Sequence, residues 1–369
     1  MKRNGWLGLS FTLSILTGGL ATAAAAQAPP AARFGEQVEV REVLLDVLVT
    51  DPQGDVVVGL GKDDFKVSED GKPVPVDSVT FYSNRRFLGT PEEARRRGID
   101  LAAVPEERYF VLFFHDQREA STEAPGLLSR QLDAARRASE WVRQDLAPSD
   151  WVAVVSYDRK LEVHADFSRD RGVLAKAIDD AVTGKDPGGN WPSRQPAGSG
   201  PSLLTQLPRG NQLRDKTPTI QAALTTLASA LGPLRGRKNL LLFTTGFGEL
   251  NAVGQYVPDL RLDTPMIQAL NTRDVAVYAI DLTPVGTEHT MANAMSHLAS
   301  ETGGRYLFDV TNYLEPLREI AKDTSGYYLL SYSARHPQGK RGYQEVKVEV
   351  RNPQFRVRAR RGYTFGGGS

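Results

Sequence analysis

The sequence predicts an α/β fold in which a doubly wound, mostly parallel sheet is inserted into a small β-sandwich. Over residues 108–324, short apolar runs alternate with helical patterns, which is typical of a parallel sheet covered by helices on both faces. Residues 36–84 and 325–365 instead alternate polar with apolar positions between turn residues, as antiparallel strands do. Because each flank is too short to form a stable domain alone, we predict one sandwich built from both.

The central strand of the sheet is expected at residues 109–114, where apolar and aromatic residues follow one another without alternation. Such a run fits a strand that is buried on both faces. It ends at His115 and Asp116, and a helical pattern follows over 122–146, so this strand end lies at the edge where open α/β sheets bind ligands. Further strands are expected at 151–157, 161–167, 240–244, 275–280 and 305–308, and further helices at 171–182, 217–234, 262–272, 289–302 and 313–324.

Turn and cap signals divide these elements. Residues 184–216 are rich in Gly, Pro, Ser and Asn and have no sustained period, so we expect a long surface loop there. Thr217 is the expected N-cap of the next helix, with Pro218 in its first turn. In the first flank, Val56–Val58 is expected to begin a strand, and Asp70-Gly71 predicts a hairpin.

Residues 1–26 have the features of a secretory signal peptide. Lys2 and Arg3 precede an apolar core, and small residues lead to a cleavage site at Ala26. The alternative, a transmembrane anchor, is disfavoured because the apolar stretch is shorter than about 20 residues and contains Gly18-Gly19. We therefore expect an exported protein, periplasmic or extracellular, with no transmembrane segment after signal cleavage. Residues 27–35 are the expected tether, 85–107 a linker and 366–369 a tail.

Charge and cysteine content exclude further classes of protein. The 45 basic and 44 acidic residues leave a net charge of +1, which argues against a nucleic-acid-binding protein that relies on bulk charge. The chain has no cysteine, so an exported form depends on its hydrophobic core and has no disulfide. Arg356, Arg358 and Arg360 alternate with apolar residues. We interpret this strand as a solvated outer face of the sandwich, with binding to an acidic surface as the alternative.

Six short segments follow one another in an order and spacing that a known family shares. They are Val47–Gly54, Leu60–Val67, Glu69–Lys72, Gly236–Thr244, Ser325–Leu330 and Val357–Tyr363. On these segments the chain resembles the exported bacterial proteins related to von Willebrand factor type A domains, a family abundant in Acidobacteria-type genomes. The resemblance spans residues 36–365. It implies a type A-like doubly wound sheet and export more strongly than it implies an activity, because most members of the family are uncharacterised.

The resemblance also implies a metal-ion-dependent adhesion site at the carboxyl edge of the sheet. Hydroxyl and carboxylate oxygens suit Mg²⁺, and a carboxylate of the partner completes the metal's shell. Here the pattern is degenerate, because Arg118, Ala120 and Thr245 stand where two Ser and an Asp are expected. The matching residues are Asp116 and either Thr217 or Thr219, which leaves Mg²⁺ as a hypothesis. The other interpretation is that Asp116 caps the following helix or pairs with Arg118.

We predict a non-enzymatic protein-binding or adhesion-type module whose protein partner the sequence does not identify. Binding is expected through loops at the carboxyl edge of the sheet, with Trp191, Arg118 and Phe247 as candidate contact residues. For Trp191, folding onto its own domain is an open alternative. Two other classes also stay open. One is a structural or assembly component of a cell-envelope complex, and the other is a hydrolase that uses His115 and Asp116, for which the sequence pairs no nucleophile.

Overall fold

The largest sheet has six strands, in the order β12-β11-β8-β5-β6-β7. The structure is a computed structural model, and it describes residues 38–83, 107–115, 125–184, 200–287 and 289–366. Every neighbouring pair is parallel except β6 and β7. The predicted mixed α/β class with a mostly parallel sheet is thereby confirmed. The strands are β5 (Tyr109–His115), β6 (Trp151–Tyr157), β7 (Leu161–Ser168), β8 (Lys238–Thr244), β11 (Val275–Asp281) and β12 (Arg305–Leu307).

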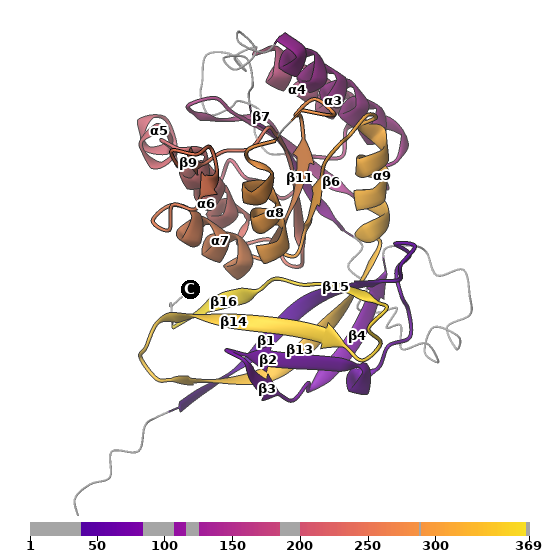
Figure 1. The fold of residues 1–369 in the computed structure, drawn as a ribbon, viewed down its shortest axis with the longest axis vertical. Coiled ribbons are helices and arrows are strands. Elements are labelled where there is room, and N and C mark those ends of the chain that lie inside the picture. Colours follow the sequence, from indigo (N-terminus) through magenta and orange to yellow (C-terminus); the bar gives the residue numbers. More distant parts are fainter. Residues whose placement is uncertain (1–37, 84–106, 116–124, 185–199, 288, 367–369) are drawn as a thin grey trace, which may run out of the picture. The chain divides into compact units, whose positions relative to one another are not determined.

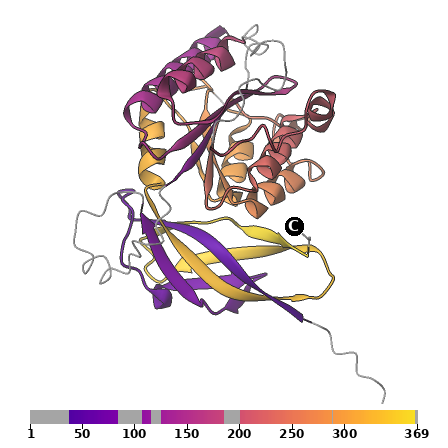
Figure 2. The ribbon, with the colours of Figure 1, turned by 180° about the vertical axis from the view of Figure 1, so that it is seen from behind.

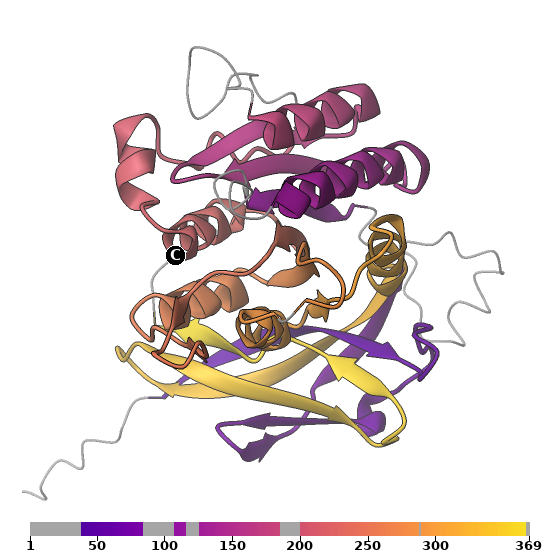
Figure 3. The ribbon, with the colours of Figure 1, turned by 45° about the horizontal axis from the view of Figure 1, so that its top comes forward.

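Helices cover both faces of this sheet, because its strands are apolar on both sides (Figure 1). One face packs against α3 (Pro125–Gln144), α4 (Arg171–Thr183) and α9 (Leu314–Asp323). The other packs against α5 (Asn211–Lys216), α6 (Ile220–Leu231), α7 (Asp263–Thr272) and α8 (Ala292–Glu301). Figure 2 gives the view from behind, and in Figure 3 helices α3 and α4 lie side by side. Among the described residues, no helix is both long and apolar enough to cross a membrane.

The strand order places a candidate binding edge at β5. The chain passes from β5 to β6 on one side and later to β8 on the other, so the order reverses at β5. Loops leave the carboxyl ends of β5 and β8 in opposite directions at such a point, which opens a crevice between them. The inner part of β5 is buried throughout, with exposed fractions of 0–1% from Phe110 to Phe114.

Eight further strands form two antiparallel sheets of four, in the orders β15-β1-β13-β4 and β16-β14-β2-β3. Both combine strands from the two ends of the described chain, as in the pairs β1–β13 and β2–β14. The sheets share one hydrophobic cluster, which includes Leu45, Phe65, Tyr328 and Val346. The strands are β1 (Val38–Thr50), β2 (Phe65–Glu69), β3 (Lys72–Val74), β4 (Ser78–Ser83), β13 (Gly326–Pro337), β14 (Gly342–Val350), β15 (Arg356–Arg358) and β16 (Gly362–Phe365), and the 3-10 helix η1 covers Lys62–Asp64.

Three local predictions are wrong. Within the predicted surface loop 184–216, the described part from 200 onward contains α5 and buries Leu203, Leu207 and Leu213 in the hydrophobic cluster under α6. Helix α6 begins at Ile220, and Thr219 is its N-cap, so Thr217 and Pro218 precede the helix. The segment Val56–Val58 forms only an isolated bridge from Val56 to Thr50.

The basic strand also differs from its predicted role as a solvated face. The Arg358 guanidinium lies 2.7 Å from the Asp323 carboxylate at the end of α9. Arg360 donates to the carbonyl of Asn271, at 2.9 Å, and to the carbonyl of Leu44, at 2.6 Å. Arg358 and Arg360 therefore join the strands that follow β14 to helices α9 and α7.

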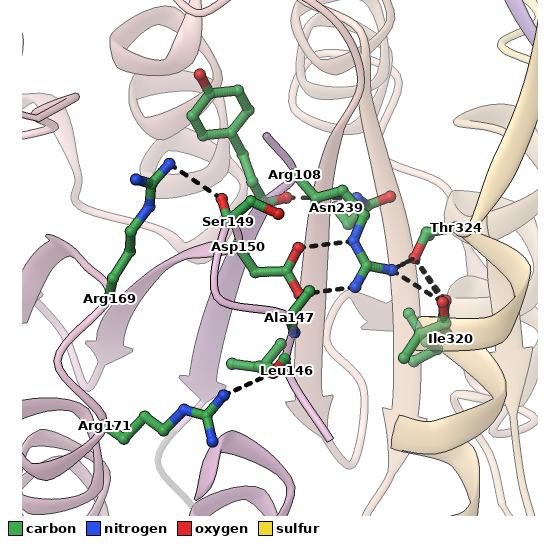
Figure 4. A network of polar contacts seen from close by, with 12 residues as sticks. Arg108, Leu146, Ala147, Ser149, Asp150, Arg169, Arg171, Asn239, Ile320 and Thr324 are labelled. Carbon is green, nitrogen blue, oxygen red and sulfur yellow. Dashed lines mark hydrogen bonds and ion pairs between the residues drawn. The ribbon is translucent and has the colours of Figure 1, made fainter. Parts of the chain in front are cut away.

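Arg108 fixes the opposite end of β5 (Figure 4). Its guanidinium forms a two-point pair with buried Asp150, with distances of 2.8 Å and 2.6 Å, just before β6. The same group donates to the Ala321 carbonyl, at 2.9 Å, and to the Thr324 hydroxyl, at 3.1 Å, at the end of α9. Two-point pairs of this kind hold both partners in a defined geometry. The central strand is thus anchored at its start to Asp150 and to the end of α9.

Candidate binding site at the carboxyl edge of the sheet

A cleft of about 430 Å³ lies where β5, β6 and β8 end. His115 and Tyr157 are the last residues of β5 and β6, and Phe247 follows β8. The cleft coincides with the reversal of the strand order, where doubly wound sheets bind their ligands. It is lined by His115, Tyr157, Asp158, Arg159, Pro218, Thr219, Ile220, Gln221, Phe247, Gly248, Glu249, Asp259 and Leu262.

His115 is part of the wall of this cleft. Its Nδ1 lies 2.8 Å from the Thr244 hydroxyl, which also accepts a hydrogen bond of 2.9 Å from the backbone N–H of Gly246. The ring lies 6.3 Å from the ring of Tyr157 and 6.2 Å from that of Phe247, measured between centroids. Thr244 is fully buried, so this hydroxyl serves the loop geometry after β8 and is not presented to a substrate.

The two threonines predicted as metal ligands have different surroundings. The Thr219 hydroxyl accepts a hydrogen bond of 3.2 Å from the Ala222 N–H as the N-cap of α6, and the residue lines the cleft. Thr217 is fully buried, and its hydroxyl donates to the Leu213 carbonyl at 2.8 Å. The structure therefore offers Thr219, and not Thr217, to the cleft.

Four other predicted site residues, Asp116, Arg118, Ala120 and Trp191, lie outside the described residues. Among the residues that are described, no group of three or more His, Asp or Glu side chains is arranged to hold a metal ion. Mg²⁺ prefers an octahedral shell of oxygens that includes carboxylates. The described residues of the cleft do not supply that shell by themselves, and the metal site stays a prediction.

A short hairpin after β8 borders the cleft, and the sequence did not predict it. It consists of β9 (Glu249–Leu250) and β10 (Tyr256–Val257), paired antiparallel. Asn251 closes its turn, because the Asn251 side-chain oxygen accepts from the N–H groups of Val253, at 3.1 Å, and Gln255, at 2.9 Å. Side-chain bonds of this type define the conformation of a turn.

Asp263, at the start of α7, holds the base of the hairpin. It is 4% exposed and accepts hydrogen bonds from the Tyr256 hydroxyl, at 2.8 Å, and from the Asp259 N–H, at 3.0 Å. Gln221 of α6 donates to the same carboxylate at 3.3 Å. Burial of Tyr256 and its bond to this carboxylate raise the pKa of the phenol. The hairpin is therefore fixed to α6 and α7 by the three hydrogen bonds that the Asp263 carboxylate accepts.

Exposed apolar side chains are concentrated on this hairpin and the segment after it. Of eleven large apolar residues that are exposed in the described part of the chain, five fall between residues 250 and 262. We call these five the hairpin patch. They are Leu250, Val253, Val257, Leu260 and Leu262, with exposed fractions of 43%, 76%, 46%, 73% and 36%.

A charged network ties the loop after β8 to the end of β11. His289 Nδ1 lies 3.0 Å from Asp281 Oδ2, and its Nε2 lies 2.9 Å from the carbonyl oxygen of Thr245. The Tyr306 hydroxyl donates to the same Asp281 oxygen at 2.8 Å. Burial opposes the charge of His289, but the Asp281 carboxylate and the Thr245 carbonyl outweigh it and raise the pKa of the imidazole. Burial opposes the charge of Asp281 as well, yet His289 holds the pKa of that carboxyl below its ordinary value.

Comparisons with known proteins bear on the fold only. No family model matches the chain. No curated protein matches it either. Solved structures with a similar fold include the conserved hypothetical protein BatB from Bacteroides thetaiotaomicron, with 12% identity over 59% of this chain and 97% of that one and a TM-score of 0.37. An aerotolerance-related membrane protein from Bacteroides fragilis has 13% identity over 58% of this chain and 98% of that one, with a TM-score of 0.36.

Proximal thread matrix protein 1 from the mussel byssus is also similar, with 13% identity and a TM-score of 0.36, over 58% of this chain and 46% of that one. All three TM-scores are below 0.5. The likenesses agree with a mixed α/β fold and carry no argument about activity or partners. The resemblance to type A domains accordingly stays a prediction from the sequence.

Proposed function

We propose that the protein is an exported, non-enzymatic binding module that holds a protein partner with the hairpin patch and the adjacent cleft. The observation that carries the proposal is the concentration of exposed apolar side chains on one short, well-fixed hairpin and the segment directly after it. A large exposed apolar patch is rare on monomeric proteins and marks an interaction site, and the five residues of the hairpin patch all fall within positions 250–262. Scattered exposed apolar residues would carry no such meaning.

The fixed conformation of the hairpin supports binding as its role. Asn251 sets the turn, and Asp263 holds the base, so the patch has its shape before a partner arrives. A surface ordered in advance loses little conformational entropy when it binds, and this raises affinity for a given contact area. The cleft beside it provides the concave part of the site, into which a side chain of the partner inserts.

The proposal includes the architecture that presents this edge. We propose a type A-like domain that is inserted into a β-sandwich, whose two halves come from residues before and after the inserted domain. The pairing of Gly326 with Ser83 supports the insertion, because the chain leaves and re-enters the antiparallel sheets at neighbouring positions. The proposal includes export because residues 1–26 have the sequence features of a secretory signal peptide.

Selection of peptides from a random display library tests the proposal. Wild-type protein is compared with the double variant Val253→Ser/Leu260→Ser, which makes the two most exposed residues of the hairpin patch polar. The control is Val40→Ser/Leu44→Ser, which changes two exposed apolar residues of β1, at 60% and 48% exposure. We expect peptides that bind wild type and control alike, and that bind the hairpin variant on the order of 10-fold more weakly or worse.

Two results contradict the proposal. One is a set of selected peptides that bind the hairpin variant with wild-type affinity. The other is a set whose binding depends on Val40 and Leu44 instead. Either result removes the hairpin patch as the binding surface, since both pairs of substitutions are made at exposed positions and leave the buried core unchanged.

A further inference from the structure

We infer that the partner segment taken by the cleft is cationic as well as apolar: a peptide with a large apolar side chain next to lysine or arginine. The inference rests on the proposed function and names the class of partner. It comes from the fixed charges and the apolar walls of the cleft, both of which belong to described residues.

The charges that the described residues bring to the cleft are predominantly negative. Asp158, Glu249 and Asp259 contribute three carboxylates, and Arg159 contributes one guanidinium, which gives a net charge of −2. Arg261 lies next to the cleft and holds Asp259 through two contacts, Nε to Oδ1 at 3.1 Å and Nη2 to Oδ2 at 2.9 Å. Even with Arg261 included, the set keeps a net charge of −1. A basic segment is therefore attracted and an acidic one is repelled.

Two further positive groups of the described residues, His289 and Arg261, are directed at acceptors of the protein itself. The His289 ring lies between the Asp281 carboxylate and the Thr245 carbonyl. The Arg261 side chain is 86% exposed, yet its guanidinium forks onto Asp259. Neither group is arranged among the described residues to receive a carboxylate from a partner.

The walls of the cleft are apolar and aromatic. Tyr157 and Ile220 are both buried, at 6% exposure, and form its inner side. Phe247 and Leu262 form the side next to the hairpin. A volume of about 430 Å³ falls within the range of sites that enclose small ligands, which gives room for a large side chain. The adjoining hairpin patch extends the apolar contact along the peptide.

Three matched synthetic peptides test the inference by fluorescence anisotropy. The first has a central Trp flanked by Lys on each side, the second has the same Trp flanked by Glu, and the third has Ser between the two Lys. We expect the Trp/Lys peptide to bind about 10-fold or more tightly than either of the others at about 50 mM salt. The advantage of Lys over Glu should shrink at about 0.5 M salt, where exposed charges are screened.

A charge-reversing substitution in the cleft provides a second test of the charge preference. Glu249→Lys should weaken binding of the Trp/Lys peptide and strengthen binding of the Trp/Glu peptide. The control is Glu42→Lys, which makes the same change of net charge at an exposed position on β1. Because Glu249 and Glu42 are both exposed, neither substitution disturbs the core, and a general charge effect would appear in both variants.

The outcomes separate the inference from the proposed function. If the Trp/Glu peptide binds as tightly as the Trp/Lys peptide, and Val253→Ser/Leu260→Ser still abolishes both, the charge preference is overturned and the binding function stands. If Glu249→Lys and Glu42→Lys act alike, the cleft is not the source of the preference, which also overturns the inference. If no peptide, designed or selected, depends on the hairpin patch, the proposed function fails and the inference fails with it.

Discussion

His289 is expected to stabilise the carboxyl edge of the sheet only while it is protonated. Its Nε2 faces the Thr245 carbonyl, which only accepts, so that nitrogen must carry a proton. Its Nδ1 faces the Asp281 carboxylate at 3.0 Å. The Tyr306 hydroxyl donates its one hydrogen to the same carboxylate, so it has none to donate to Nδ1. Nδ1 is therefore itself a donor to Asp281. Below the raised pKa of His289 both nitrogens therefore donate, and the ring is an imidazolium.

The magnitude follows from what deprotonation removes. The neutral ring keeps its bond to Thr245, and the Tyr306 hydroxyl keeps donating to Asp281. What is lost is the hydrogen bond from Nδ1 to the Asp281 carboxylate, and a hydrogen bond to a charged group is worth about 1.5–3 kcal/mol. Because the folded state raises the pKa of His289, the stabilisation is complete below about pH 6.5 and is lost as the pH rises through the folded-state pKa.

Urea unfolding of wild type and His289→Gln at about pH 5.5 and about pH 8.5 checks this prediction. The variant should be less stable by about 1.5–3 kcal/mol at the lower pH, and the gap should close at the higher pH. His297→Gln is the control, since His297 is exposed on α8 and should show little effect at either pH. A gap that is equal at both pH values, or NMR of labelled histidine with a neutral His289 ring at about pH 6, would refute the reasoning.

Three further predictions concern buried charge, backbone and cap. Burial and the neighbouring Asp274 raise the pKa of Asp46. The stability of the wild-type protein should therefore fall as the pH rises from about 4 through that raised pKa. Urea unfolding of Asp46→Asn should not show this fall in stability with pH. Gly248 has φ +129°, and an added Cβ would lie 2.6 Å from the Tyr256 ring. Gly248→Ala should therefore displace the hairpin and weaken the binding of selected peptides about 10-fold, measured by fluorescence anisotropy. The control Gly254→Ala, at the turn, should weaken their binding less. Thr219→Ala should cost about 1 kcal/mol in urea unfolding by removing the N-cap of α6, and Thr219→Ser should restore it.

The sequence predicted the strands of the parallel sheet well, for a physical reason. A strand buried on both faces must be apolar at every position, and runs such as Phe110–Phe114 have no other common explanation at that length. Observed bounds agree with the predicted ones to within about two residues, which is the usual uncertainty of element ends. The carboxyl edge was predicted from the apolar run that ends at His115 and is followed by a helical pattern, and His115 and Phe247 do line the cleft.

Features that depend on distant partners were not predictable from local patterns. Leu203 and Leu207 are four apart, a helical spacing that could have indicated a buried segment, but Gly, Pro and Ser around them suggested a loop. The His289–Asp281–Tyr306 network joins residues up to 25 positions apart, and no sequence pattern links them. The alternation of residues 356–360 predicted a strand, and the observed strand β15 covers only Arg356–Arg358. Alternation does not say what covers a face, and here Asp323 contacts Arg358.

The pairing of Gly326 with Ser83 has a mechanical consequence. Tension applied at residues 38 and 366 is transmitted through hydrogen bonds between strands of the antiparallel sheets, above all the long β1–β13 pair. Residues 84–325 form a closed excursion from that path of strand pairs, and they stay joined to it by side-chain contacts such as those of Arg358 with Asp323 and of Arg360 with Asn271. A molecule pulled by its ends would therefore load the strand pairs first and would load the helices near the cleft only through these side-chain contacts. Force delivered by a bound partner would reach the antiparallel sheets through the same contacts as well as through β4 and β13.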